Sequence, residues 1–224
     1  MPSCDDFLAR GCRAFGLDLS AAQRADLCCY YRELDKWSKK MNLVAKAPME
    51  EILASHFLDS LSLLPHLPQH EFRLLDVGSG AGFPGLVLKT VCPAMQLTLV
   101  EPRAKRVTFL RHIIRTLQLA RVTLVQERLA PDEAMVQRLG LFDVVTSRAL
   151  ADIKTFLSLA EPFVKAGGRI ICMKGPKAAE ELAAWQAAKK QPMLTYRGGV
   201  VCPTADSGKQ RQLLFFENKE RLVP

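Results

Sequence analysis

Several features that would fix a class of protein are missing from this 224-residue chain. No apolar run approaches the roughly 18 residues of a membrane-spanning helix, so we expect no membrane association. The first residues are acidic and carry no signal-peptide pattern. Seven cysteines are scattered without a Cys-x-x-Cys pair or a Cys/His cluster, and the adjacent Cys28 and Cys29 fit helix packing. We therefore expect reduced thiols, a cytoplasmic location and no metal site.

Familiar catalytic motifs are missing too. The chain has neither a Gly-x-Ser-x-Gly elbow nor a Gly-x-x-x-x-Gly-Lys phosphate loop. Ser147, Arg148 and Ala149 stand where an Asn/Asp-Pro-Pro-aromatic motif would follow a fourth strand. This argues against methylation of the exocyclic amino groups of adenine or cytosine. No Pro-Cys nucleophile stands there either, which argues against covalent attack on cytosine.

The positive charge of the chain is unevenly placed. The net charge is +8; residues 1–70 hold eight basic and nine acidic side chains, whereas residues 71–224 hold 23 and 14. Such a surplus favours a polyanionic partner such as nucleic acid. The alternative is a basic isoelectric point that only aids solubility.

The most informative segment is residues 72–85, an apolar run that leads into alternating glycines. The run ends in an acid, and the turn follows: Asp76, Gly78, Gly80 and Gly82. This pattern predicts a buried strand, a tight turn and a helix whose free N–H groups face a ligand. Phe83 stands where a dinucleotide fingerprint has its third glycine, which disfavours a nicotinamide site. The pattern resembles motif I of the S-adenosylmethionine (SAM) methyltransferases.

A second acid follows at the expected distance. Residues 96–101 read as another strand and end in Glu101, roughly 20 residues past the glycine turn. A carboxylate there can accept hydrogen bonds from both hydroxyls of a ribose. The alternative for Glu101 is a solvated strand end. Together, the turn and the acid indicate a ligand of the adenosine type.

The chain is expected to divide into a helical segment, 1–66, and an α/β domain, 67–224. In the first part, Ser20 and Gln23 form a capping box, and a helix over 50–64 lies between prolines. The later part predicts strands at 72–77, 96–101, 122–127, 142–147, 168–174, 193–201 and 210–217. Helices are expected at about 83–91, 103–118, 131–139, 152–165 and 177–189. This alternation predicts a doubly wound, mostly parallel sheet with helices on both faces and a final antiparallel hairpin, the class I methyltransferase fold.

Further candidate residues stand at strand ends, where open α/β sheets bind ligands. Leu129 and Ala130 fall where an adenine would lie after the third strand. Arg128, Arg148 and Lys174 would put three cations around one cleft, although each alone could be a solvated charge. His56 and Asp59 are three residues apart on one predicted helix face. They are either an acid-base pair or a polar packing cluster.

Residues 30–175 resemble one family, the RsmG (GidB) bacterial 16S ribosomal RNA guanine-N7 methyltransferases. The similar segments, in order, are 36–43, 56–60, 75–85, 105–110, 147–149 and 174–175. The turn ending in Phe83, Pro84 and Gly85 is the most specific. The sequence departs from the family where Ala81 replaces a frequent proline and Ala130 a frequent glutamate.

The resemblance implies that Gly78, Phe83, Leu129, Ala130 and Arg148 contact SAM, which leaves as S-adenosylhomocysteine. It implies a partner in 16S rRNA or the small ribosomal subunit, without a metal, and we expect a monomer. Guanine N7 carries a lone pair and no proton, so the reaction requires positioning more than a base. Arg128 and Lys174 would then hold phosphate or O6. The alternatives are a small-molecule methyltransferase and a non-catalytic SAM-sensing RNA binder.

Overall fold

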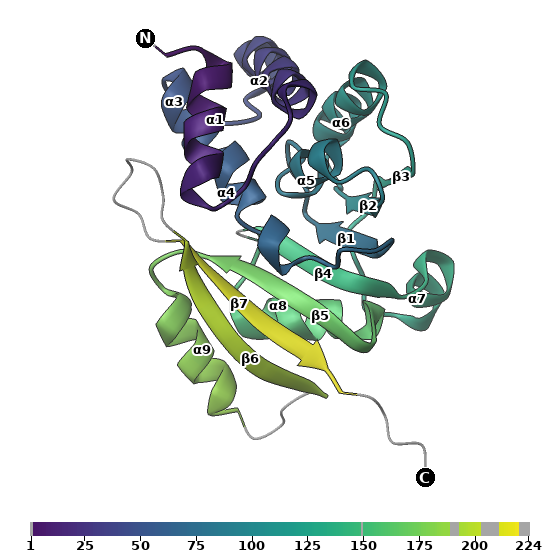
Figure 1. Cartoon of the computed structure of the whole chain (residues 1–224). Helices are drawn as coiled ribbons and strands as arrows, with labels where there is room; N and C mark the ends of the chain where they lie inside the picture. Colours follow the sequence, from purple (N-terminus) through teal and green to yellow (C-terminus); the bar gives the residue numbers. More distant parts are fainter. Residues whose placement is uncertain (1, 149, 189–192, 203–210, 220–224) are drawn as a thin grey trace.

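The computed structural model describes residues 2–148, 150–188, 193–202 and 211–219 (Figure 1). Helices come first in the chain: α1 (Cys4–Ala14), α2 (Ala21–Met41), α3 (Met49–Ile52), η1 (Leu53–Leu58), α4 (Asp59–Leu61) and η2 (Leu64–His66). The predicted capping box is confirmed, because Ser20 accepts from the N–H of Gln23 and the Gln23 side chain accepts from the N–H of Ser20. Asn42 ends α2 in the left-handed conformation, with φ 50°.

The helix expected over 50–64 is not a regular α-helix. Its middle, η1, is a π-helix between the short α-helices α3 and α4. α1 lies close against this segment, since a Cβ added to Gly11 would be 2.2 Å from a methyl carbon of Leu58. Apolar spacing does not separate a π turn from an α turn, so the sequence did not predict it. Such turns are frequent at functional sites.

Strands and helices alternate from residue 73 onward. The strands are β1 (Arg73–Val77), β2 (Gln96–Val100), β3 (Val122–Val125), β4 (Phe142–Arg148), β5 (Val164–Lys174), β6 (Leu194–Cys202) and β7 (Arg211–Asn218). The helices are α5 (Gly85–Val91), α6 (Ala104–Thr116), α7 (Glu133–Leu139), α8 (Ile153–Ala160), η3 (Glu161–Phe163) and α9 (Ala178–Gln186). The prediction was correct in order and type. The last turn of the helix expected to 165 is instead η3 followed by β5, and positions 149, 189 and 210 lie outside the described residues.

The strands form one seven-stranded sheet in the order β3-β2-β1-β4-β5-β7-β6. β1 to β5 are parallel, and β7 pairs antiparallel with both β5 and β6. This confirms the class I methyltransferase fold. β2 and β3 lie on one side of β1, and β4 and the strands after it lie on the other. The carboxyl ends of β1 and β4 therefore border the switch point where such sheets bind ligands.

Two hydrophobic cores lie against the sheet. One joins the amino-terminal helices to α5, α6 and one face of the sheet, through side chains such as Leu34, Phe57, Leu86 and Phe109. The other lies under α7, α8 and α9 (Figure 1). The amino-terminal helices thus share a core with the helices that follow β1 and β2. This packing fixes them over the carboxyl ends of the strands.

The expectation of fully reduced cysteines was wrong for two of them. Cys4 and Cys28 form a disulfide that ties α1 to α2. No sequence pattern indicated this pair, because only the packing of α1 on α2 brings the two residues together. Among the described residues, no helix is long and apolar enough to cross a membrane.

Candidate functional site

The glycine turn after β1 is held by backbone hydrogen bonds, both to β2 and within the turn. The N–H groups of Gly78 and Ser79 donate to the Val100 carbonyl, at 2.8 and 3.2 Å. The Ser79 carbonyl accepts from the N–H groups of Gly82 and Phe83, at 2.7 and 3.0 Å. Gly80, at the tip, has φ +59°, and an added Cβ there would meet no atom nearer than 3.8 Å. The turn is therefore rigid, and its open side faces empty space.

Glu101 ties the end of β2 to this turn. Its carboxylate accepts from the N–H of Gly80 at 2.9 Å through one oxygen and from the N–H of Arg103 at 2.9 Å through the other. The Arg106 guanidinium lies 3.5 Å away. Each oxygen still has a free lone pair, as hydrogen bonding to two ribose hydroxyls requires.

Asp76 supports the turn from below and lies outside the cavity lining. It is fully buried, and its Oδ2 accepts from the N–H of Gly85 at 3.0 Å. Its Oδ1 has no hydrogen-bond partner. Burial raises the pKa of Asp76 to about 7, against the hydrogen bonds from Gly85 and Ser79 that lower it.

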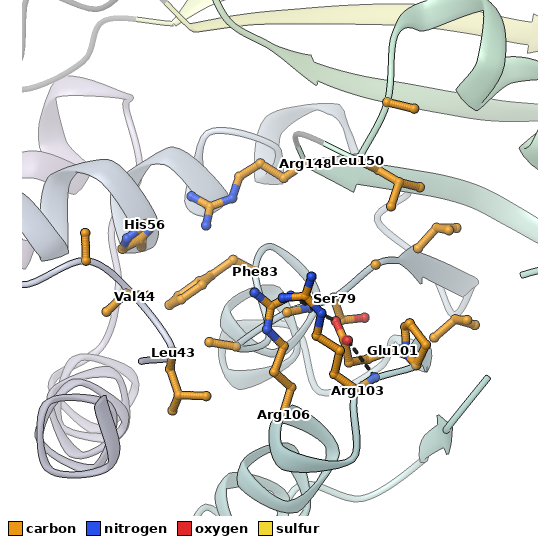
Figure 2. A pocket seen from close by; sticks show the side chains of 18 of the residues that line it. Leu43, Val44, His56, Ser79, Phe83, Glu101, Arg103, Arg106, Arg148 and Leu150 are labelled. Atoms are coloured by element: carbon orange, nitrogen blue, oxygen red, sulfur yellow. Dashed lines mark hydrogen bonds and ion pairs between the residues drawn. The ribbon is translucent and has the colours of Figure 1, made fainter. Parts of the chain in front are cut away.

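A cavity of about 830 Å³ opens over the turn, between the carboxyl ends of the strands and the amino-terminal helices (Figure 2). Its floor is the glycine turn with Phe83, and Glu101 and Leu129 line it from the strand ends. Leu43 and Val44, which follow α2, close the opposite side. A volume of this size suits a nucleoside-sized ligand together with a second group.

Phe83 is the centre of an aromatic cluster at the inner end of the cavity. The ring of Tyr30 stacks on it at 5.8 Å, and that of His56 at 4.9 Å. The Arg148 guanidinium lies 5.0 Å from its centroid. Tyr30 also donates to the carbonyl of Ala81, 2.5 Å away. The amino-terminal helices therefore contact the glycine turn directly through Tyr30 and His56.

Arg148 is held by the π segment. Its guanidinium donates to the Ser55 carbonyl at 2.8 Å and lies 3.3 Å from the Asp59 carboxylate. The N–H of Asp59 donates to Ala54, five residues back, rather than to Ser55, as it would in an α-helix. The π turn thus leaves the Ser55 carbonyl open to Arg148. The other oxygen of Asp59 accepts from Arg211 at 2.8 Å, so one buried carboxylate pairs with two arginines.

His56 is half-buried with its ring against Phe83, and its buried Nδ1 has no hydrogen-bond partner. Burial and the nearby Arg148 and Arg211 lower its pKa to about 3. The imidazole is therefore neutral at physiological pH. In this state the ring can pack and can donate or accept a hydrogen bond, but its low pKa makes it a poor general base.

The structure brings most of the expected site residues together. Those that line the cavity are Gly78, Gly80, Phe83, Glu101, Leu129, Arg148, Arg128 and His56. Asp76 and Gly82 do not line the cavity, and Ala130 donates its N–H to the sulfur of Met135 next to the lining.

Lys174 is not brought to the cavity. Its ammonium group pairs with Glu181 at 2.8 Å and donates to the Ala151 carbonyl. Lys174 is only 8% exposed. The expectation of three cations around one cleft therefore fails for Lys174, because a neighbouring helix supplies a carboxylate that its strand-end position did not reveal.

Several lining residues were not predicted. They are Leu43, Val44, Ser55, Arg103, Arg106 and Arg211. Leu43 and Arg106 lie in segments that resemble the RsmG family, which was an available signal. Ser55 and Arg211 carried no signal, since their place depends on the π turn and on the return of β7.

The cavity fits SAM on the evidence of its own shape and donors. The glycine turn leaves room at Gly80, and the Glu101 carboxylate stands at its edge. Leu129 offers an apolar wall for the adenine. For a metal, the described residues contain no group of three His, Cys, Asp or Glu side chains placed to hold one.

Solved structures with the same fold have low sequence identity to this chain. One is the cofactor-bound Rv0187 from MTB, with a TM-score of 0.58 and 16% identity, over 98% of this chain and 99% of that one. Another is TrmN from Thermus thermophilus, with a TM-score of 0.56 and 16% identity, over 78% of this chain and 55% of that one. At this identity the likeness is one of fold.

Sequence relatives are much closer. A protein of Desulfotalea psychrophila called ribosomal RNA small subunit methyltransferase G is 50% identical over 79% of this chain and 81% of its own length. One of the same name from Myxococcus xanthus is 38% identical over 95% of this chain and 96% of its own. Residues 23–208 match the family described as GidB, rRNA small subunit methyltransferase G. The chain belongs to this family.

Proposed function

We propose that this protein transfers the methyl group of SAM to N7 of a guanine in the decoding-region loop of 16S ribosomal RNA. Its family gives the coarser activity, SAM-dependent methylation of small-subunit rRNA. The observation that carries the assignment to N7 is a cavity built to position a base rather than to deprotonate it. Its lining includes His56, whose lowered pKa makes the imidazole a poor base, and Glu101 already accepts two backbone N–H groups.

Guanine N7 suits this lining because its lone pair needs no base. Bound SAM supplies an electrophilic methyl group, and the protein holds N7 in line with it, away from water. We assign Gly78, Phe83, Leu129, Ala130 and Arg148 to the cofactor and Glu101 to the ribose. A cation bonded to both O6 and N7 would block the reacting lone pair. Arg128 is therefore assigned to phosphate or to O6 alone.

Lys174 receives a different assignment. Through the Ala151 carbonyl and Glu181 it supports the turn between β4 and α8, beside the lining residue Leu150. The protein would act in the cytoplasm on the small ribosomal subunit or its RNA. It would act as a monomer, because a large structured RNA must reach the cavity.

The test is transfer of a labelled methyl group to unmethylated small ribosomal subunits. Borohydride reduction followed by aniline then cuts the RNA at N7-methylguanosine and locates it. We expect one cut in the decoding-region loop. Label in RNA without this cut would contradict the assignment to N7. Label only in small molecules would support a small-molecule enzyme, and SAM binding without transfer would support a sensing protein.

A further inference from the structure

The ends of two helices meet beside the cavity mouth. Glu33 of α2 contacts His112 of α6 at 2.5 Å, and Trp37, one turn later in α2, packs on Phe109, one turn earlier in α6. The helices are therefore antiparallel, and the last turn of α2 lies beside the first turn of α6. Both ends lead into the cavity lining, through Leu43 on one side and residues 103–106 on the other (Figure 2).

This part of the mouth carries five exposed cations, here called the basic rim. They are Lys40, Lys46, Arg103, Lys105 and Arg128. None of the five has an ion pair among the described residues. In contrast, Lys39 pairs with Asp35 at 2.8 Å and Arg106 with Glu101 at 3.5 Å. The rim is thus positive charge that the fold leaves uncompensated.

The cavity behind the rim does not supply the missing negative charge. Its lining has five arginines against three glutamates. Glu101 is already bound by the glycine turn, and both oxygens of Glu127 pair with Arg138 at 2.7 Å. Among the described lining glutamates, only Glu51, on α3, has no side-chain partner. An anionic chain laid across the mouth would therefore find cations on the rim.

We infer that the basic rim binds the sugar–phosphate backbone next to the target nucleotide, so that one base turns into the cavity while its neighbours stay outside. This inference rests on the proposed function, because it assumes an RNA substrate. An RNA strand suits the rim because it carries a negative charge at every nucleotide, and the cations of the rim come from two helix ends, the loop after α2 and the loop after β3, around one opening. Placing the reacting base in an enclosed pocket requires its extrusion from the stack.

The test uses two matched double variants of the full chain. Lys40→Glu with Lys105→Glu reverses two charges of the rim. Arg32→Glu with Arg115→Glu reverses two exposed charges of the same helices, roughly 12 and 15 Å further along them. Filter binding to protein-free 16S rRNA and to small ribosomal subunits is measured against salt, and calorimetry measures SAM affinity.

We expect the rim variant to lose at least about tenfold in affinity for both RNA probes, and its plot of log affinity against log salt to flatten by about 1.4, or roughly 0.7 per lost contact to a single strand. SAM affinity should stay within about twofold of wild type, which also reports intact folding. The control variant should keep both properties. Equal losses in the two variants, or none in the rim variant, would overturn the inference.

Two further outcomes are distinguishable. A rim variant weakened on subunits but normal on protein-free rRNA would mean that the rim contacts a ribosomal protein, and would overturn the RNA assignment. A wild-type protein that places no methyl group in either RNA would refute the proposed function, whereas failure of the rim variant alone to show a defect refutes only the rim.

Discussion

The imidazole of His56 lies nearly parallel to the ring of Phe83, with 4.9 Å between centroids and 20° between planes. One ring comes from the π segment and the other from the glycine turn. Partial burial and the charges of Arg148 and Arg211 lower the pKa of His56 to about 3 from 6.5. Of the two predicted roles of His56, in an acid-base pair or in a packing cluster, the geometry favours the second: a neutral ring packed on the glycine turn.

Acid should destabilise the protein through this histidine. Between about pH 6.5 and pH 3 the unfolded chain takes up a proton at His56 that the folded protein does not, so this contribution to stability is lost as the pH falls. His56→Phe keeps the aromatic stack and removes the titration. Denaturant unfolding from pH 7 to 4 should show a shallower loss of stability in His56→Phe than in wild type. Parallel curves would contradict the buried neutral state.

Asp76 should act in the opposite direction. Its pKa is raised to about 7 from 3.8, so between these values the folded protein holds a proton that the unfolded chain has lost. This contribution is present below about pH 4 and is lost as the pH rises through about 7. In Asp76→Asn, which keeps an acceptor for the N–H of Gly85, stability should rise more steeply from pH 4 to 7 than in wild type. An unchanged pH profile would show that the folded-state pKa of Asp76 is ordinary.

Asp59→Asn should lower the stability of the protein strongly, because it leaves Arg148 and Arg211 next to each other without their shared carboxylate. Breaking a buried pair of this kind costs about 3–5 kcal/mol of unfolding free energy. We also expect SAM affinity to fall at least about tenfold, since Arg148 lies over Phe83. Asp35→Asn, which breaks the exposed pair with Lys39, is the control and should cost under about 1 kcal/mol. Similar effects of the two variants would contradict the special role of Asp59.

Two glycines of the turn should fail in different ways. A Cβ at Gly82 would be 2.2 Å from the Tyr30 hydroxyl, so Gly82→Ala should lower Tm by several degrees. At Gly80 a side chain meets open space, so Gly80→Asn, a residue that tolerates positive φ, should fold and bind SAM less tightly. Gly80→Asp adds a charge near Glu101 and should abolish binding. Calorimetry compares the SAM affinities of Gly80→Asn and Gly80→Asp; equal affinities would rule out a role for charge at this position.

The sheet, and the side of the site formed by the glycine turn and Glu101, could be predicted from the sequence because local signals encode both. Alternating apolar runs set the strands, and the glycine turn and Glu101 lie within one strand–turn–helix–strand unit. The opposite side of the site could not be predicted from the sequence, for a physical reason. Arg211 reaches the cavity only because β7 returns beside β5, and Lys174 is withdrawn because α9 brings Glu181 to it. Such pairings depend on contacts between distant segments, which a single sequence does not encode locally.

The π turn also makes the length of its helix a functional quantity. It accommodates one residue more than an α turn, whereas each residue of an α-helix advances the side chains by roughly 100°. Deleting one residue within 53–58 would leave a more regular helix of similar composition. The residues before the deletion would keep their orientation, but Asp59 would rotate away from Arg148. This helix should therefore accept many substitutions along its path and not a single change of length.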